Sequence, residues 1–176
     1  VNHIARIAEM GEEGLFSYGG RRGDSRSMFV NGETAMWINS SAYYGGFASD
    51  IEDFEFGQAM LPLDTDLAEE PQNSIIGGAT LWVLQGHESP EYTCTAEFFS
   101  FLSEPEQQAM WHQETGYVPI TTAAYELSQE QGFYEEAPGT DTAIKQLSLN
   151  EPTANSKGLR FGNFVQIRDI INEELE

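Results

Sequence analysis

The stretch from residue 34 to residue 44 has the composition of an anion-binding turn. We expect the apolar run Thr34–Asn39 to form a buried strand, and Ser40 and Ser41 to supply the N-cap of a short helix through Tyr43 and Tyr44. The start of a helix leaves backbone N–H groups without partners, and such groups attract anions. This strand–turn–helix segment therefore predicts a binding site for a negatively charged group.

Three further features have structural explanations at the level of sequence. Gly77-Gly78 interrupts the apolar run Ile75–Leu84, which indicates either a bulge or a close approach of another group to the backbone. Tyr117 lies in a predicted turn, where its ring could pack on Pro119. Arg168 lies in a predicted amphipathic helix, where the sequence alone favours a surface ion pair with Asp169 or Glu173.

The sequence gives little indication of a metal site or of a nucleophilic cysteine. The histidines His3, His87 and His112 are far apart and lack a metal-ligand spacing, so we expect surface or helix-end positions and no metal site. Cys94 is the single cysteine, which excludes an internal disulfide. Its apolar neighbours in a predicted helix favour a buried structural thiol over a nucleophile.

Catalysis has no clear motif either. The sequence has no Gly-x-Ser-x-Gly elbow and no phosphate-binding loop. Carboxylate pairs such as Asp50 and Asp53 arise by chance in a chain with 29 acidic residues. We therefore expect no enzyme activity, no catalytic residue and no cofactor.

The charge narrows the classes of partner. The chain has 176 residues, with 29 acidic and 8 basic side chains, so its net charge is −21. This balance argues against nucleic-acid binding, which requires basic surface. An apolar fraction of 40% is sufficient for a packed core. If the protein binds an anion, a few local donors must do so against an unfavourable overall field.

The elements that would position these residues alternate in type. Strands are predicted at 34–39, 54–62 and 75–84, which with the helices indicates an α/β class. Both ends of the chain fall within helical patterns, so we expect a fragment. Helices are predicted at 1–14, 24–31, 90–102, 104–114 and 164–176, with short helices beginning near 121, 128 and 140. Ser103 is the expected cap of the helix at 104–114. The apolar face of the last helix is expected to point inward, and Trp37, Trp82 and Trp111 are expected in the core and not as ligand-stacking surfaces.

Several strings together resemble one protein family, the solute-binding proteins of ABC importers, and within it the subgroup that binds glycerol 3-phosphate. The resemblance runs in order over nearly the whole chain. The strings are FSYGGR at 16–21, PQNSIIGGATLWVLQG at 71–86, WHQETGYVPIT with AAY at 111–125, QGFYEEAPGTDTA at 131–143, and KGLRFGN with VQIR at 157–168.

The resemblance implies a type II periplasmic-binding-protein-like fold, in which two α/β lobes close around a solute. Residues 1–176 would be mostly the C-terminal lobe, without the N-terminal lobe and the final helices. The protein would be periplasmic or otherwise extracytoplasmic and a monomer. It would carry a small phosphate ester, such as sn-glycerol 3-phosphate or a glycerophosphodiester, to ABC permease subunits in the membrane.

The resemblance also implies four ligand contacts on this chain: the hydroxyl of Ser41, the backbone N–H of Gly78, the phenol of Tyr117 and the guanidinium of Arg168. All four are donors, as a phosphate monoester requires, and arginine can hold two oxygens at once. The chain departs from the family at Phe164-Val165, where the family has Met-Pro, and this affects the expected direction of Arg168.

Two alternatives remain open at the level of sequence. A sugar- or oligosaccharide-binding protein of the same superfamily would need aromatic stacking surfaces and fewer anion donors. A carbohydrate-active hydrolase would use a pair of carboxylates and would turn over its substrate.

Overall fold

The computed structural model describes residues 2–21, 23–66, 70–154 and 156–175. Val1 and Glu176, the outer ends of two predicted helices, lie outside the described residues. The chain separates into two compact units. Unit 1 comprises Val1–Ile38, Leu61–Ile75 and Leu149–Glu176, and unit 2 comprises Asn39–Met60 and Ile76–Ser148.

Unit 1 contains the helices α1 (Asn2–Glu12), α2 (Arg26–Val30) and α9 (Phe164–Leu175), which confirms the helices predicted in these regions. Exposed ion pairs join Arg6 to Asp64 and Asp66. The ring of Trp37 stacks on Phe29 next to α2, and its indole nitrogen donates to the Ser25 hydroxyl at 2.8 Å.

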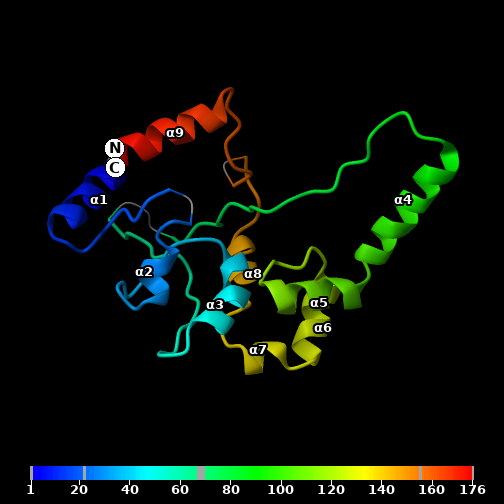
Figure 1. Ribbon diagram of the computed structural model, residues 1–176, viewed down its shortest axis with the longest axis horizontal. Coiled ribbons are helices and arrows are strands. Elements are labelled where there is room, and N and C mark those ends of the chain that lie inside the picture. The colour runs from blue at the N-terminus through cyan, green and yellow to red at the C-terminus, as the bar shows by residue number, and fades with distance from the viewer. Residues whose placement is uncertain (1, 22, 67–69, 155, 176) are drawn as a thin grey trace. The chain divides into compact units, whose positions relative to one another are not determined.

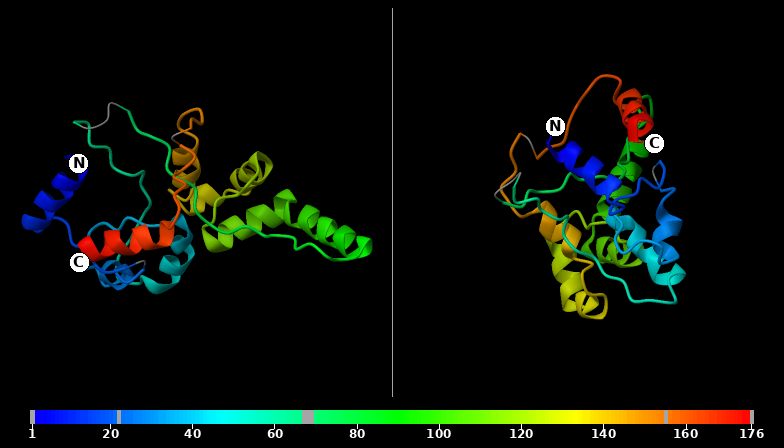
Figure 2. Two further views of the ribbon diagram at one scale, coloured as in Figure 1. Left: turned by 90° about the horizontal axis from the view of Figure 1, so that it is seen from above. Right: turned by 90° about the vertical axis from the view of Figure 1, so that its left-hand side faces the viewer.

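Unit 2 holds the remaining helices. Those at 89–102, 105–115, 122–130 and 142–147 begin within two residues of the predicted positions, but the helix predicted to begin near residue 128 begins at Phe133. Helix α5 packs on both α3 and α6, and these helices lie beside one another in Figure 1. Helix α4 projects away from them, as the left view of Figure 2 also shows. The elements are η1 (Ser41–Tyr43), α3 (Tyr44–Asp50), α4 (Ser89–Leu102), α5 (Pro105–Thr115), α6 (Thr122–Glu130), α7 (Phe133–Glu136) and α8 (Thr142–Leu147).

The two ends of α5 follow from local sequence. Pro105 occupies the first helical position, where its missing N–H costs nothing. The N-cap is Glu104 and not Ser103, which was the predicted cap. Gly116 ends the helix with φ of 76°, in the left-handed region that favours glycine.

The three predicted strands differ from the structure. Residues 34–39, 54–62 and 75–84 have no regular secondary structure, and no strand forms among the described residues. A strand is completed by the hydrogen-bond ladder of a neighbouring strand. The described residues offer these segments no such neighbour, although their apolar composition suits a sheet.

The buried interior of unit 2 lies mainly between α5 and α6. Ala109 and His112 on α5, and Ala124 and Ser128 on α6, are each at most 2% exposed. Small residues at the contact allow two short helices to approach closely. Phe47 of α3 is also buried, and its ring meets Phe56 edge-on at 5.9 Å.

Several burial predictions are wrong. Trp82 and Trp111 were expected in the core but are 85% and 58% exposed. Cys94 is exposed on α4 and is not a buried thiol. The apolar residues of α9, predicted to face inward, are exposed as well, because no other element of unit 1 covers this face in the described part of the chain.

Within the described ranges, every helix is too short or too polar to span a lipid bilayer.

Candidate functional site

Ser41 stands at the start of η1, as the sequence predicts, but it does not cap that helix. Ser40 is the N-cap, and its hydroxyl accepts from the backbone N–H of Ala42 at 3.3 Å. The side chain of Ser41 makes no hydrogen bond with any other described residue. Its hydroxyl is therefore available to a ligand.

The start of η1 contacts the end of α5 at a glycine. A Cβ added to Gly116 would lie 2.6 Å from the carbonyl oxygen of Ser41 and 3.3 Å from the Cβ of Tyr44. Only a residue without a side chain fits this space, and its φ of 76° also favours glycine. Gly45 likewise leaves room for a close contact between the two segments, because a Cβ at this position would lie 2.9 Å from the carbonyl oxygen of Glu114. Two glycines thus hold Ser41 next to the turn that carries Tyr117.

Hydrogen bonds fix the main chain of that turn. The N–H of Gly116 donates to the carbonyl of His112 at 2.9 Å, and the N–H of Tyr117 donates to the Thr115 hydroxyl at 3.2 Å. The carbonyl of Tyr117 accepts from the His112 ring nitrogen Nδ1, 2.7 Å away. The backbone at Tyr117 is therefore held on both sides. Its side chain is 43% exposed, and its phenol has no partner among the described residues.

His112 connects this turn to a cluster of partly buried aromatic rings in unit 2. Since Nδ1 faces a carbonyl, it carries the proton, and Nε2 accepts from the hydroxyl of Tyr134 at 3.1 Å. The imidazole meets the ring of Phe133 edge-on at 5.5 Å. The turn thus rests on a histidine that occupies a helix end, as predicted, but is buried and not at the surface. Its place four residues before the glycine that ends α5 is the signal that could have identified it.

Burial shifts the acid–base properties of this pair. Desolvation lowers the pKa of His112 below 6.5, although its bond to the Tyr117 carbonyl and the negative charge of Asp141 act in the opposite direction. Desolvation also raises the pKa of Tyr134 to about 12. Both groups are therefore neutral near pH 7, which suits a hydrogen-bonded pair that holds a main-chain turn.

Gly78 approaches the same turn from a third segment. A Cβ on Gly78 would lie 3.8 Å from Cε1 of the Tyr117 ring, which is ordinary van der Waals contact. The φ of Gly78 is 119°, a conformation that residues with side chains rarely adopt. This agrees with the close-approach interpretation of the Gly77-Gly78 pair.

Three of the four predicted contacts are thus brought together in unit 2: Ser41, Gly78 and Tyr117. Arg168 lies on α9, which belongs to unit 1. The predicted ion pairs of Arg168 with Asp169 or Glu173 do not form in the described structure, where Glu173 instead lies 4.0 Å from Arg21.

The cluster has the chemistry of a hydrogen-bonding site. It offers a hydroxyl, a phenol and a backbone N–H, which can all donate to oxygen atoms of a ligand. No group of three or more metal-ligating side chains occurs within the described residues. Such a set of donors suits the binding and orientation of a ligand.

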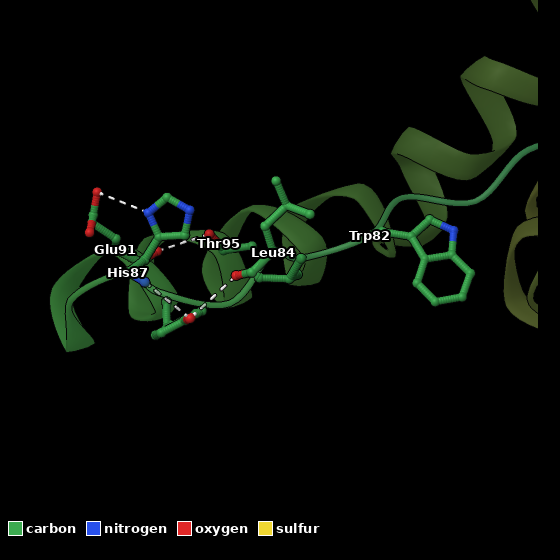
Figure 3. Close-up of a pocket in the computed structure, with 7 residues that line it drawn as sticks. Trp82, Leu84, His87, Glu91 and Thr95 are labelled. Atoms are coloured by element: carbon green, nitrogen blue, oxygen red, sulfur yellow. Dashed lines mark hydrogen bonds and ion pairs between the residues drawn. The ribbon is translucent and has the colours of Figure 1, made fainter.

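A separate open groove of about 330 Å³ lies between the segment before α4 and the first turns of that helix. Figure 3 shows exposed Trp82 at one end and the ion pair between His87 and Glu91 at the other. None of the four predicted contact residues lines this groove, and its walls are exposed. We therefore place the candidate site at the Tyr117 turn.

Comparison with known proteins supplies the family. Residues 2–142 match the family described as bacterial extracellular solute-binding protein. The sn-glycerol-3-phosphate-binding periplasmic protein UgpB of Escherichia coli K12 is 50% identical over all 176 residues, and this region makes up 40% of that protein. The proteins of the same name from Shigella flexneri and Salmonella typhimurium are 50% and 49% identical over the same length.

The chain thus spans 40% of the length of the curated relatives it matches. The family match extends over most of the chain and includes Ser41, Gly78 and Tyr117. The chain belongs to the bacterial extracellular solute-binding protein family.

Proposed function

We propose that this chain is the C-terminal-lobe region of a two-lobe solute-binding protein of an ABC importer, with the α/β type II fold. The protein captures sn-glycerol 3-phosphate or a glycerophosphodiester outside the cytoplasm, in the periplasm, and delivers it to a membrane permease. It acts as a monomer and binds its solute without turnover.

The observation that carries this proposal is the meeting of three donors from separate segments. A Cβ added to Gly78 would come within 3.8 Å of the Tyr117 ring, and the carbonyl of Ser41 lies against Gly116, the preceding residue of the same turn. A phosphate monoester has three terminal oxygens and nearly two negative charges, so it requires several converging donors. The relatives at about 50% identity, whose name specifies glycerol 3-phosphate, support the same ligand for this chain.

The proposed site must overcome the charge of its own protein. A net charge of −21 repels an anionic solute at long range. Short hydrogen bonds to a charged acceptor contribute about 1.5–3 kcal/mol each and operate at contact distance, where screening by salt is weak. Arg168 would add a formal positive charge to these neutral donors, and its guanidinium can bind two phosphate oxygens at once.

The lobe described here would hold the phosphate, and the N-terminal lobe would hold the glycerol hydroxyls. Closure of two lobes about a hinge is the common motion of such binding proteins. This division predicts that inorganic phosphate binds weakly, because it cannot engage the second lobe.

Isothermal titration calorimetry on the full-length protein tests the proposal with four solutes: glycerol 3-phosphate, glycerophosphocholine, inorganic phosphate and maltose. We expect heat from at least one of the two glycerol esters, and recovery of the intact ester after incubation. Heat from maltose alone would identify a sugar-binding protein and contradict the proposal. Hydrolysis of a glycoside would indicate an enzyme.

A further inference from the structure

The main chain of the turn that carries Tyr117 is held by a buried residue outside the four proposed ligand contacts. His112 is 2% exposed and lies on α5 beneath the turn formed by Thr115, Gly116 and Tyr117. It holds this turn at two points: its main-chain carbonyl accepts from Gly116, and its ring nitrogen Nδ1 donates to the carbonyl of Tyr117. The second bond is 2.7 Å long.

The ring of His112 is itself held in one orientation. The hydroxyl of Tyr134 lies 3.1 Å from Nε2, and the rings of Phe133 and Tyr134 lie within 5.7 Å of the imidazole, measured between ring centroids. A flip of the imidazole would place carbon atoms against both the Tyr117 carbonyl and the Tyr134 hydroxyl. Both would then be unsatisfied polar groups next to a buried ring, which is costly.

The direction of the Tyr117 phenol depends on this arrangement. The phenol has no hydrogen bond of its own within the described structure, so its place depends on the backbone that carries it. A rotation of the Tyr117 peptide by some tens of degrees would move the phenol oxygen by ångströms, since the side chain is long. The bond from Nδ1 opposes that rotation.

We propose that His112 is a positioning residue of the solute site, which holds the Tyr117 phenol in its binding orientation through the hydrogen bond from Nδ1 to the Tyr117 carbonyl. This inference rests on the proposed function, because the orientation matters only if Tyr117 contacts the solute. Tyr134 assists by fixing the imidazole.

Two amide substitutions separate this role from simple packing. In His112→Asn the amide nitrogen takes the place of Nδ1 and can still donate to the Tyr117 carbonyl. In His112→Gln the amide group reaches the position of Nε2, near Tyr134, and nothing stands at Nδ1. Both variants lose a similar amount of buried ring, so a purely structural role affects them alike.

The affinity of the full-length protein for glycerol 3-phosphate is then measured by calorimetry, together with the melting temperature of each variant. We expect H112N to bind within about 3-fold of the wild type and H112Q to bind at least 10-fold more weakly, at similar melting temperatures. Equal affinities of the two variants would overturn the proposal. His112→Phe, which fills the same aromatic space without either nitrogen, should bind as weakly as H112Q.

A second measurement keeps this inference separate from the proposed function. Relaxation of ¹³C-labelled tyrosine rings reports the order of the Tyr117 side chain without any ligand. We expect the Tyr117 ring to become more mobile in H112Q and to stay ordered in H112N. If the wild-type protein binds no glycerol ester, the proposed function fails, and this comparison alone decides whether His112 orders Tyr117. Equal mobility of the Tyr117 ring in the two variants would show that His112 does not order Tyr117.

Discussion

The carbonyl oxygen of Ser41 occupies the space that a side chain on Gly116 would need, since a Cβ there would lie only 2.6 Å away. This contact joins the segment that begins η1 to the turn that carries Tyr117. It places Ser41 against the residue that precedes Tyr117, although Ser41 and Tyr117 are 76 positions apart in sequence.

Substitution of Gly116 should therefore disrupt both the fold and the site. Gly116→Ala combines left-handed strain with a backbone clash, and we expect it to lower the free energy of unfolding by about 2–5 kcal/mol. Gly132→Ala is the matched control, because Gly132 has the same φ of 76° but no atom within 4 Å of an added Cβ. It should cost about 1–2 kcal/mol. Urea denaturation of both variants measures the difference, and equal losses would show that the Ser41 contact is unimportant.

The phenol of Tyr117 should affect binding and leave stability alone. Its hydroxyl has no partner among the described residues, so Tyr117→Phe removes no internal hydrogen bond. We expect affinity for glycerol 3-phosphate to fall by about 1–2 kcal/mol, which is about 5- to 30-fold in Kd. Tyr92→Phe, at the separate groove near α4, should leave affinity unchanged. Calorimetry compares the two, and an equal affinity of Y117F and wild type would remove Tyr117 from the site.

Arg168 is expected to supply the positive charge of the closed site. Arg168→Ala in the full-length protein should weaken phosphate-ester binding by about 2–3 kcal/mol, which is about 30- to 150-fold in Kd, because a desolvated phosphate would lose its counter-charge. Arg6→Ala is a suitable control, since Arg6 forms exposed ion pairs with Asp64 and Asp66. If both variants bind alike, Arg168 has no role in the site.

The pair of His112 and Tyr134 predicts how stability depends on pH. Burial lowers the pKa of His112 from 6.5, so the unfolded state binds a proton more readily, and stability should fall as the pH drops below 6.5. Burial raises the pKa of Tyr134 from 10.0 to about 12, so the unfolded state loses its proton first, and stability should fall as the pH rises above 10.0.

Urea midpoints between pH 5 and pH 11 measure both slopes. The variant H112N should flatten the slope between pH 5 and pH 7, and Tyr134→Phe should flatten the slope above pH 10, because each removes one titrating group. Unaltered slopes in these variants would show that the two side chains are not the groups that titrate.

Local patterns in the sequence were sufficient to predict the helices. The proline at position 105 and the glycine at position 116 mark the two ends of α5, and Thr121 caps α6 through its hydroxyl, as expected from residue type. These signals act over a single turn of chain, so they need no knowledge of tertiary structure. The exact N-cap of α5 was missed by one residue.

Burial could not be predicted in this way. The apolar residues of α9 and the indole of Trp82 have the composition of core residues, but their exposure depends on whether another surface covers them. A periodic pattern indicates that one face of a helix is apolar, but it does not show which element packs against that face. The predicted strands depend on tertiary structure in the same way, because a hydrogen-bond ladder requires a neighbouring strand.

The residues of the candidate site could be predicted only in part, because contacts between distant segments form only in the folded chain. Ser41, Gly78 and Tyr117 were named from residue type and family resemblance, and the structure brings them together. The role of His112 was missed because its place four residues before Gly116 is only a weak signal, and its bonds to Tyr117 and Tyr134 appear only after the chain folds.

The crystal structure of the full-length protein with glycerol 3-phosphate tests the central claim most directly. We predict phosphate oxygens within about 2.6–3.2 Å of the Ser41 hydroxyl, the Gly78 N–H and the Tyr117 phenol, with the Arg168 guanidinium on the same group. A phosphate held by other residues, with the Tyr117 phenol turned away from it, would contradict this account.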